Sequence, residues 1–397
     1  SVVLGHELNM SPTLPFCQGL FQGFLSVENP FAELIRHPGP VIVIHGKNDN
    51  IAPESTWRNW SKALQQVGTY PAAIEVDVRL TQDGIPAILH DPTFHVMANW
   101  YKTPDWRVQK FFSENPHLAK TRFPWDPDYY LFDGVDSYPW FEIRKKFKIF
   151  DPLMPRQLDP ISLSELLGAL TIPGQFSVPS YIYWSNKYNQ LERHPEENIA
   201  LAKTPLIFLD FKPINNLALR LYGLSDWNWI LGSYDLSQLQ QYTRNAIEQL
   251  SLSLSAMGAH RKTFVAARHP QVDRLIKLVD PQINVMISPE SVRPKMKFSP
   301  EEAIAAFEEV NLSPGTLIEI RYLAHLMSPQ IRGWAKARGL VIFYNQIHQT
   351  DISQFRGPYQ NNLPRLYQDL FSQGSDLWVQ TNTPRELRDF IDTLFHP

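Results

Sequence analysis

The stretch from Ala73 to Leu89 alternates apolar and polar residues in a way that predicts two strands joined by a tight turn. Along its first half, β-branched residues alternate with charged ones, as in a strand that buries one face. Asp83-Gly84 is a typical hairpin dipeptide, and the short apolar run Pro86–Leu89 follows it. We therefore expect a β-hairpin here, and the candidate chemistry of the chain gathers around it.

Glu75 and Asp77 lie two positions apart on the first of these strands, so their side chains share one face. Two neighbouring carboxylates repel each other, and a hard cation such as Ca²⁺ or Mg²⁺ would compensate their charge. An ordinary hairpin with a solvent-exposed polar face would explain the same alternation equally well. His90 ends the second strand beside Asp91, a position suited to proton transfer.

Outside the hairpin, strand-like runs alternate with helical patterns along most of the chain. Such alternation predicts a parallel sheet, in which chemistry gathers where strands end. His45 follows the first run directly, although a single histidine after a strand is more often structural than catalytic. The predicted strands are Val41–Ile44, Thr204–Lys212, Thr263–Ala267, Asn284–Ser288, Thr316–Tyr322, Leu340–Asn345 and Gly374–Thr381.

Composition excludes several classes of function. The net charge of −3 and the lack of a basic block give no support for a nucleic-acid partner. The single cysteine, Cys17, excludes an internal disulfide and a cysteine metal cluster. Residues 166–186 carry no charge, but Gly and Pro interrupt them, so no transmembrane segment is expected. No signal peptide is expected either; the protein would be secreted or periplasmic if a leader has been removed, and otherwise cytoplasmic.

The hairpin also carries a family resemblance. The segment EVDVRLTQDGIPAILHDPT, residues 75–93, closely resembles the core motif of the glycerophosphodiester phosphodiesterases, within the superfamily of phospholipase C-like phosphodiesterases. Pro53-Glu54-Ser55-Thr56 resembles a second motif of that family, P-E-N-T, which follows a histidine after the first strand. The resemblance covers most of residues 41–91 and a short motif near 205–212.

This resemblance implies a (β/α)₈ TIM barrel and a metal-dependent phosphodiesterase. One divalent ion, Ca²⁺ or Mg²⁺, would be held by Glu75, Asp77 and Asp210. His45 and His90 would act as acid and base on opposite sides of the phosphorus, in an order that the sequence leaves open. Lys47 and Lys212 would add positive charge near the substrate phosphate. The residues implied for the site are His45, His90, Glu75, Asp77, Asp210, Lys47 and Lys212.

The chain departs from the family pattern at three places. His45-Gly46-Lys47 stands where the family usually has His-Arg-Gly, and a lysine is a point charge instead of a bidentate fork. Asp210-x-Lys212 stands where the family has Glu-x-Lys, and a simple salt bridge between these two residues is the alternative interpretation. The last strand ends in Thr381-Asn382, where the family usually has Thr-Asp.

At 397 residues, the chain is longer than the roughly 250 residues that one barrel needs. We expect an N-terminal extension over residues 1–39 and a barrel over 40–397, with an insertion after the third strand at about 92–160. The insertion is rich in aromatic residues and would cover the barrel mouth or form a peripheral subdomain. The two hairpin strands and the seven listed runs make nine candidates for eight places. One of 284–288 and 316–322 is therefore expected to be accessory.

Three hypotheses about function remain open at this stage. The first is hydrolysis of a small-molecule glycerophosphodiester to an alcohol and glycerol 3-phosphate. The second is a phospholipase D-type enzyme of the same barrel that acts on a lysophospholipid or sphingolipid. The third is a barrel that binds a phosphorylated ligand or partner with little turnover.

Four further strand-end residues are expected to line the mouth as pocket-wall or structural groups, namely Arg268, His269, Glu319 and Asn345.

Overall fold

A computed structural model describes most of the chain. The described residues are 40–46, 55–90, 135, 138–146, 149–151, 156–185, 190–201, 204–212, 240–293, 298–320, 328–347, 363–371 and 377–395. The expected N-terminal extension, Lys47 and most of the expected insertion lie outside these residues, so the expectations for them stay predictions.

Eight parallel strands form one sheet that nearly closes on itself. Neighbouring strands follow the order β12-β11-β10-β2-β1-β15-β14-β13. A parallel bridge between Ile287 and Ile318 joins the two ends of this sheet. The TIM barrel expected from the sequence is therefore confirmed. The strands are β1 (Val41–Ile44), β2 (Ala72–Leu80), β10 (Leu206–Phe211), β11 (Thr263–Ala266), β12 (Asn284–Val285), β13 (Leu317–Ile320), β14 (Val341–Ile347) and β15 (Leu377–Thr381).

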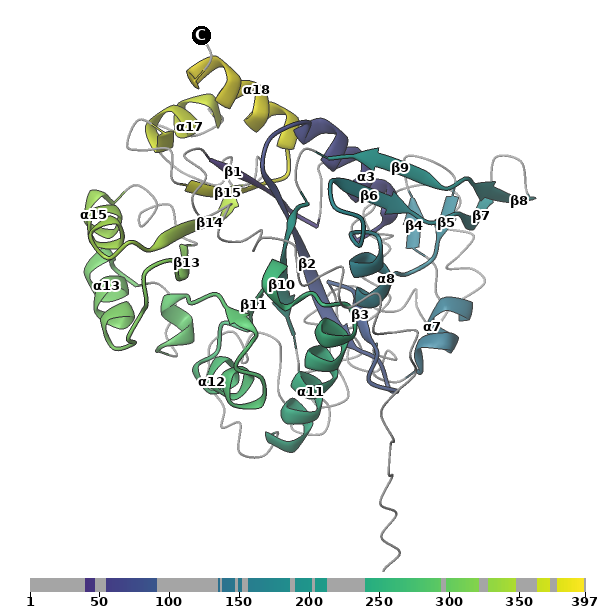
Figure 1. Ribbon diagram of the computed structural model, residues 1–397, viewed down its shortest axis with the longest axis horizontal. Helices are drawn as coiled ribbons and strands as arrows, with labels where there is room; N and C mark the ends of the chain where they lie inside the picture. Colours follow the sequence, from purple (N-terminus) through teal and green to yellow (C-terminus); the bar gives the residue numbers. More distant parts are fainter. Residues whose placement is uncertain are drawn as a thin grey trace, which may run out of the picture.

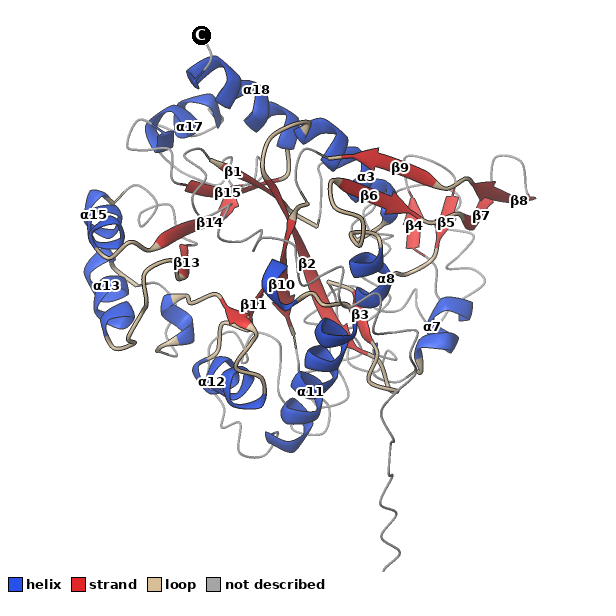
Figure 2. Cartoon of the chain, in the orientation of Figure 1, coloured by secondary structure: helices blue, strands red, loops and turns tan. Residues whose placement is uncertain are grey.

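Helices surround the strands and follow them in sequence (Figure 1; Figure 2). Several begin with a side-chain cap that the sequence supplies. Ser299 accepts a hydrogen bond from the backbone N–H of Glu302, whose carboxylate accepts one from the N–H of Ser299. Proline follows Ser299 at the first helical position, where its missing N–H costs little. The helices are α3 (Trp57–Val67), α11 (Gln240–Ala256), α12 (Pro270–Val279), α13 (Pro300–Glu308), α15 (Pro329–Ala337), α17 (Leu363–Phe371) and α18 (Pro384–Phe395).

Aromatic side chains fill the lower part of the barrel interior. Phe208 stacks on Phe264 and Phe343, with ring centroids 5.4 and 4.8 Å away, and meets Trp378 edge-on at 5.7 Å. These residues come from four different strands and belong to one buried cluster. Because side chains alternate along a strand, the residues two positions further on also face inward, at the carboxyl ends of the strands. The packed aromatic layer thus forms the floor on which a site at the barrel mouth is built.

The second strand of the hairpin, β3 (Pro86–Ile88), does not belong to the barrel. It pairs antiparallel with the end of β2, with Pro86 opposite Leu80, because the Asp83-Gly84 turn reverses the chain. Both β12 and β13 are barrel strands, so the expectation that one of 284–288 and 316–322 is accessory was wrong. The surplus strand is β3, since a tight hairpin cannot supply a parallel neighbour.

Between β3 and β10, the described residues form two helices and two small antiparallel sheets beside the barrel (Figure 1). Among them, α8 begins with a capping box between Ser162 and Glu165 and packs against β3. These elements are α7 (Trp140–Lys146), β4 (Ile149–Asp151), β5 (Arg156–Leu158), α8 (Leu163–Gly168), β6 (Gln175–Val178), β7 (Tyr181–Ser185), β8 (Gln190–His194) and β9 (Glu197–Ala200).

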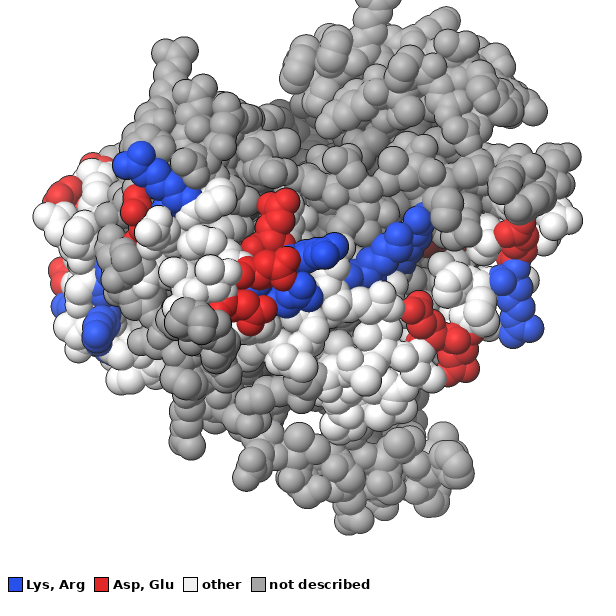
Figure 3. Space-filling view, turned by 90° about the horizontal axis from the view of Figure 1, so that it is seen from above, with Lys and Arg blue, Asp and Glu red and all other residues white. Residues whose placement is uncertain are grey.

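The surface is charged but mixed. On the face drawn in Figure 3, acidic and basic side chains lie against one another. Arg338 and Glu308 form such a pair between α15 and α13, with 2.8 Å between Nη2 and Oε1 and both side chains about half exposed. Among the described helices, none has the length and apolar character needed to span a bilayer.

Lys262 is an exception to the usual exposure of lysine. It ends the short 3₁₀ helix η5 (His260–Lys262) before β11, is only 7% exposed, and donates a hydrogen bond of 3.2 Å to the carbonyl of Leu170. Burial lowers the pKa of its ammonium group to about 8. The contact joins the start of β11 to the segment after α8. Because the pKa of Lys262 is lowered, the contribution of this side chain to the free energy of unfolding depends on pH.

We predict that replacing Lys262 changes how stability responds to pH. Its folded-state pKa lies below the unfolded value near 10.5, so the unfolded chain binds more protons between these values. The wild type therefore gains stability as pH rises from about 8 towards 10, whereas Lys262→Met lacks this gain. The difference in free energy of unfolding should shift by about 1.4 kcal/mol per pH unit in that range.

Urea denaturation at pH 7.5, 8.5 and 9.5 measures this difference. Lys336→Met, which replaces an exposed lysine on α15, is the control and should show no comparable trend. A constant difference between wild type and Lys262→Met across these pH values would contradict the prediction.

Candidate functional site

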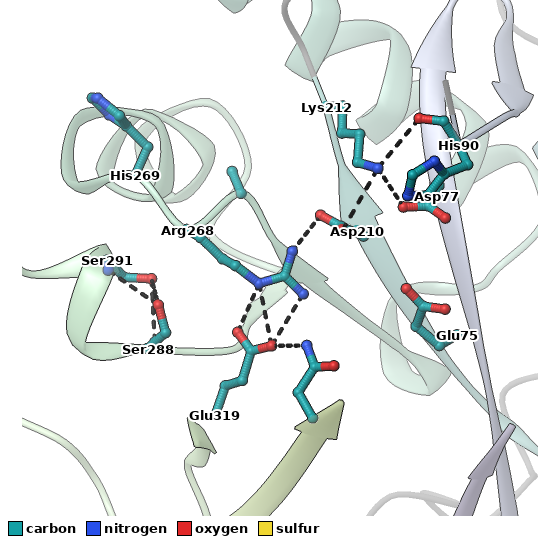
Figure 4. Close-up of polar contacts among 12 residues, drawn as sticks. Glu75, Asp77, His90, Asp210, Lys212, Arg268, His269, Ser288, Ser291 and Glu319 are labelled. Atoms are coloured by element: carbon teal, nitrogen blue, oxygen red, sulfur yellow. Dashed lines mark hydrogen bonds and ion pairs between the residues drawn. The ribbon is translucent and has the colours of Figure 1, made fainter. Parts of the chain in front are cut away.

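Three carboxylates from two neighbouring strands meet at the barrel mouth. Glu75 and Asp77 lie on β2 and are only 6% and 2% exposed. Asp210 lies on β10, directly opposite Asp77 in the parallel register. One oxygen from each of the three carboxylates lies within 4.8 Å of the others. Figure 4 shows the three side chains on their two strands, on the same side of the sheet. The structure thus brings together the three residues that the resemblance implied as metal ligands.

Lys212 lies next to two of these carboxylates, two residues beyond Asp210. Its Nζ is 2.7 Å from Oδ1 of Asp77 and 4.0 Å from Oδ2 of Asp210, and it donates a 3.3 Å hydrogen bond to the carbonyl of His90. Burial lowers the pKa of Lys212, but the negative charges of Asp77 and Asp210 raise it by more than this. The pKa of Lys212 is therefore raised overall. The ammonium group therefore stays charged. The salt bridge that the sequence offered as an alternative exists, although its shorter arm goes to Asp77.

Glu75 is held by the turn that follows β1. Its Oε2 accepts a 3.0 Å hydrogen bond from the backbone N–H of Gly46 and lies 3.8 Å from Nε2 of His45. A Cβ at position 46 would lie 3.4 Å from the Glu75 carbonyl and 3.6 Å from Oε2, which is ordinary contact. The backbone N–H, and not the missing side chain, is therefore what position 46 supplies to the carboxylate.

The other side of this turn is fixed by α3. Asn59 donates a 2.6 Å hydrogen bond from Nδ2 to the carbonyl of Gly46, and the backbone N–H of Ser55 donates to the same oxygen at 3.2 Å. Thr56 caps α3 by accepting from the N–H of Asn59. The helix start therefore positions the residue that follows His45, and the sequence motif at 53–56 has a structural role at its described end.

His45 also contacts the last strand of the barrel. Its Nδ1 lies 2.7 Å from Oδ1 of Asn382, the residue directly after β15. An amide oxygen only accepts hydrogen bonds, so Nδ1 carries the proton in this contact. Nε2, on the Glu75 side, is then the basic nitrogen of the neutral ring. The second departure from the family pattern, Asn382, is thus a direct partner of His45.

His90 follows β3 at the exposed rim of the site. Its backbone is tied down on both sides: the carbonyl accepts from Nε of Arg79 at 3.0 Å and from Lys212. The N–H of Leu89 donates to the carbonyl of Asp77 at 3.0 Å. Figure 4 shows His90 beside Asp77, on the side of Lys212. The hairpin thus brings this histidine back to the strand that carries the carboxylates.

Of the four strand-end residues expected only to line the mouth, Arg268 contacts the carboxylate cluster directly. Arg268 lies 2.6 Å through Nη1 from Oδ1 of Asp210, and its Nε lies 2.8 Å from Oε2 of Glu319. Asn345 donates a hydrogen bond to Glu319, which is fully buried. His269 is also buried, but Figure 4 shows it on the α12 side, turned away from the carboxylates. The sequence signal for this network was a polar or charged residue at the end of three predicted strands, namely Arg268, Glu319 and Asn345.

The electrostatics of the cluster suit a cation. The pKa of Glu75 is raised to about 7. Burial and then the charge of Asp77 raise it most, with a smaller contribution from Asp210, while His45 and the Gly46 N–H lower it. Oδ2 of Asp77 is fully buried and has no hydrogen-bond partner among the described residues. Buried polar atoms are nearly always satisfied, so this oxygen is suited to a bound cation. Carboxylate oxygens are the donors that hard divalent ions prefer.

Comparisons with known proteins concern a segment of the chain and the fold. Residues 52–159 match the model of the glycerophosphoryl diester phosphodiesterase family, a family of phosphoric diester hydrolases. This match includes β2 and β3 and confirms the resemblance found in the sequence. The comparison with curated proteins finds no match.

Two solved structures share the barrel. One, from Silicibacter pomeroyi DSS-3, is provisionally named a glycerophosphoryl diester phosphodiesterase; it is 15% identical, with 92% of this chain and 98% of that chain covered and a TM-score of 0.55. A glycerophosphoryl diester phosphodiesterase from Parabacteroides distasonis ATCC 8503 is 15% identical, with 92% of each chain covered and a TM-score of 0.51. These likenesses support the fold. Over residues 52–159, this chain is thus similar to the glycerophosphoryl diester phosphodiesterase family.

Proposed function

We propose that this protein hydrolyses glycerophosphodiesters to an alcohol and glycerol 3-phosphate, with one divalent ion and two histidines. The observation that carries the proposal is the convergence of His45, His90 and the three carboxylates at one barrel mouth, within and beside the segment that matches the family. A phosphodiester is an anion that repels nucleophiles, so hydrolysis needs positive charge and placed proton carriers.

Glu75, Asp77 and Asp210 would hold the ion, Ca²⁺ or Mg²⁺. Each of these carboxylates has one oxygen bound to a protein donor: the Gly46 N–H, Lys212 or Arg268. Each would therefore have its other oxygen to offer the ion. When bound, the ion supplies neutralisation of the phosphate charge and polarisation of a phosphoryl oxygen.

His45 is assigned as the general base. Asn382 keeps the proton on Nδ1, so Nε2 accepts the proton of the attacking hydroxyl, which belongs to water or to the glycerol of the substrate. The contact with Asn382 also fixes the ring plane, in the way that a third group orients the base in other hydrolytic sites. Nε2 lies 3.8 Å from Glu75, at the edge of the carboxylate cluster, where the phosphate would be bound.

His90 is assigned as the general acid. It lies on the other side of the cluster, next to Asp77, and its exposed position suits an alcohol that leaves towards solvent. Lys212 would attract the phosphate as a fixed positive charge, and Lys47, which lies outside the described residues, would add a second one.

Two other functions are separated from this one by their products. A lysophospholipid-directed enzyme of the same barrel would turn over a lysolipid and leave glycerophosphocholine intact. A barrel that binds a phosphorylated ligand would show binding without release of any alcohol. Among the described residues, the retained histidines and carboxylates favour catalysis over binding alone.

The first prediction for the site is that divalent-ion affinity rises with pH. Glu75 has a pKa near 7 and must lose its proton when it becomes a ligand, so Kd should fall by about tenfold per unit between pH 5.5 and 7. Stability responds with the opposite sign: without an ion, charging the buried Glu75 opposes folding, so stability falls as pH rises from about 4.5 to 7. Titration calorimetry with Ca²⁺, Mg²⁺ and Mn²⁺ measures the affinity.

Asp77→Asn is the matched variant for this experiment. It keeps the shape of the side chain and a hydrogen-bond acceptor for Lys212 but removes the charge. Binding should weaken by 100-fold or more, whereas Glu308→Gln on the surface should change nothing. Two results would contradict the assigned ligands. One is that each ion binds the wild type with the same Kd at pH 5.5 and at pH 7.5. The other is that Asp77→Asn binds the ions with the same Kd as the wild type.

The second prediction concerns the reaction. Glycerophosphocholine should release glycerol 3-phosphate in the presence of Ca²⁺ or Mg²⁺ and not in chelator, and His45→Ala should lower kcat by 10²- to 10⁴-fold. His194→Ala is the control, because this histidine lies on β8 and stacks on Tyr181 outside the barrel. A lysophospholipid is assayed in parallel. No turnover of glycerophosphocholine with any ion would refute the proposed reaction.

The third prediction separates the roles of the two histidines. An aryl ester of glycerol phosphate with an acidic phenol needs no protonation as it leaves, whereas choline does. His90→Ala should therefore lose at least 10²-fold in kcat on glycerophosphocholine but less than tenfold on the aryl ester. His45→Ala should lose activity on both substrates. The reverse pattern would exchange the two roles.

A further inference from the structure

Arg268 has a backbone conformation that few residues with a side chain adopt. Its φ is +54°, in the left-handed region, at the carboxyl end of β11. Asp273, in the first turn of α12, accepts hydrogen bonds from the N–H groups on either side: from Ala267 at 3.2 Å and from His269 at 3.1 Å. Such a conformation costs on the order of 1–3 kcal/mol and persists only where the surroundings impose it. The strain directs the Arg268 side chain into the barrel mouth.

The guanidinium group of Arg268 is fixed from the β13 side. Nε lies 2.8 Å from Oε2 of Glu319 and 3.2 Å from Oε1, and Nη2 donates to Oε1 at 3.0 Å. Asn345 donates a further hydrogen bond to Oε1. Burial lowers the pKa of Arg268, but Asp210 and Glu319 raise it well above its ordinary value, so the group is always charged. A planar fork held this firmly presents its remaining nitrogen, Nη1, in one direction.

Nη1 lies 2.6 Å from Oδ1 of Asp210. This contact has the same form as the 2.7 Å contact between Lys212 and Oδ1 of Asp77. In both, a partly buried cationic side chain binds one oxygen of a carboxylate that belongs to the cluster. Aspartate is one methylene shorter than the glutamate of the family motif, so its carboxylate has less reach and its orientation matters more.

We propose that Arg268 is the positioning residue of the cation site: held by Glu319 and Asn345, it orients Asp210 towards Glu75 and Asp77. The proposal rests on the proposed metal site. Two effects oppose each other here, because the positive charge of Arg268 also repels a divalent ion. An Arg268→Lys substitution separates them, since it keeps the charge and removes the fork that spans Glu319 and Asp210.

Titration calorimetry with Mn²⁺, Ca²⁺ and Mg²⁺ at pH 7.5 tests the proposal without reference to activity. Arg268→Lys should raise Kd by about 10- to 100-fold, the usual effect of removing a group that orients a metal ligand. Arg338→Lys is the matched control, because Arg338 makes a comparable 2.8 Å ion pair with Glu308 on the surface, and its Kd should be unchanged.

A double-mutant cycle tests whether Arg268 acts through Asp210. In an Asp210→Asn background, Arg268→Lys should change Kd by less than twofold, because the carboxylate that it orients is gone. Equal effects of Arg268→Lys in both backgrounds would overturn the proposal and show a general structural role. If Arg268→Lys does not fold, Glu319→Gln serves as the second variant, with the same expectation in both backgrounds.

The outcomes separate this proposal from the proposed function. Ion binding that depends on Arg268, without hydrolysis of glycerophosphocholine, would support the positioning role and refute the reaction. Ion-dependent hydrolysis with a Kd unchanged within twofold in Arg268→Lys would support the reaction and overturn the positioning role. Absence of any ion binding by the wild-type protein would overturn both.

Discussion

Three carboxylates buried within 4.8 Å of one another are the constraint on which the rest of the site depends. Two unit charges at that separation repel by at least about 3 kcal/mol at an effective dielectric constant of about 20. The protein answers this repulsion with one donor for each carboxylate: the N–H of Gly46 for Glu75, Lys212 for Asp77 and Arg268 for Asp210. Burial, followed by the charge of Asp77, nevertheless raises the pKa of Glu75.

The departures from the family motif lie close together and support one another. Gly46 stands where the family has arginine and contacts Glu75 through its backbone. Asn382, in place of aspartate, contacts His45. Asp210, in place of glutamate, contacts Arg268. Taken one at a time, these exchanges would weaken the resemblance, but in the structure each belongs to the same set of contacts around the carboxylates.

The sequence predicted what depends on local periodicity and missed what depends on closure of the barrel. Glu75 and Asp77 share a face because strand side chains alternate, and Asp210 could be placed with them by its motif. The contact from Arg268 to Glu319 could not be predicted, because it requires a left-handed residue held by Asp273 and crosses the sheet past β12. The hairpin strand β3 was correctly expected as antiparallel but was counted as a barrel strand. For this reason one of 284–288 and 316–322 was wrongly expected to be the surplus strand.

Closure of the barrel has a mechanical consequence. Among the described residues, β2 and β10 pair over a long register, whereas the ends of the sheet meet at the single bridge Ile287–Ile318. Breathing of the barrel is expected first at this thin joint. The ion pair between Arg268, after β11, and Glu319, on β13, crosses the same joint at the mouth. Opening of the joint would break the contact between Arg268 and Glu319 and so leave Asp210 without its fixed partner. Closure of the barrel wall and the affinity of the mouth for a cation are therefore coupled.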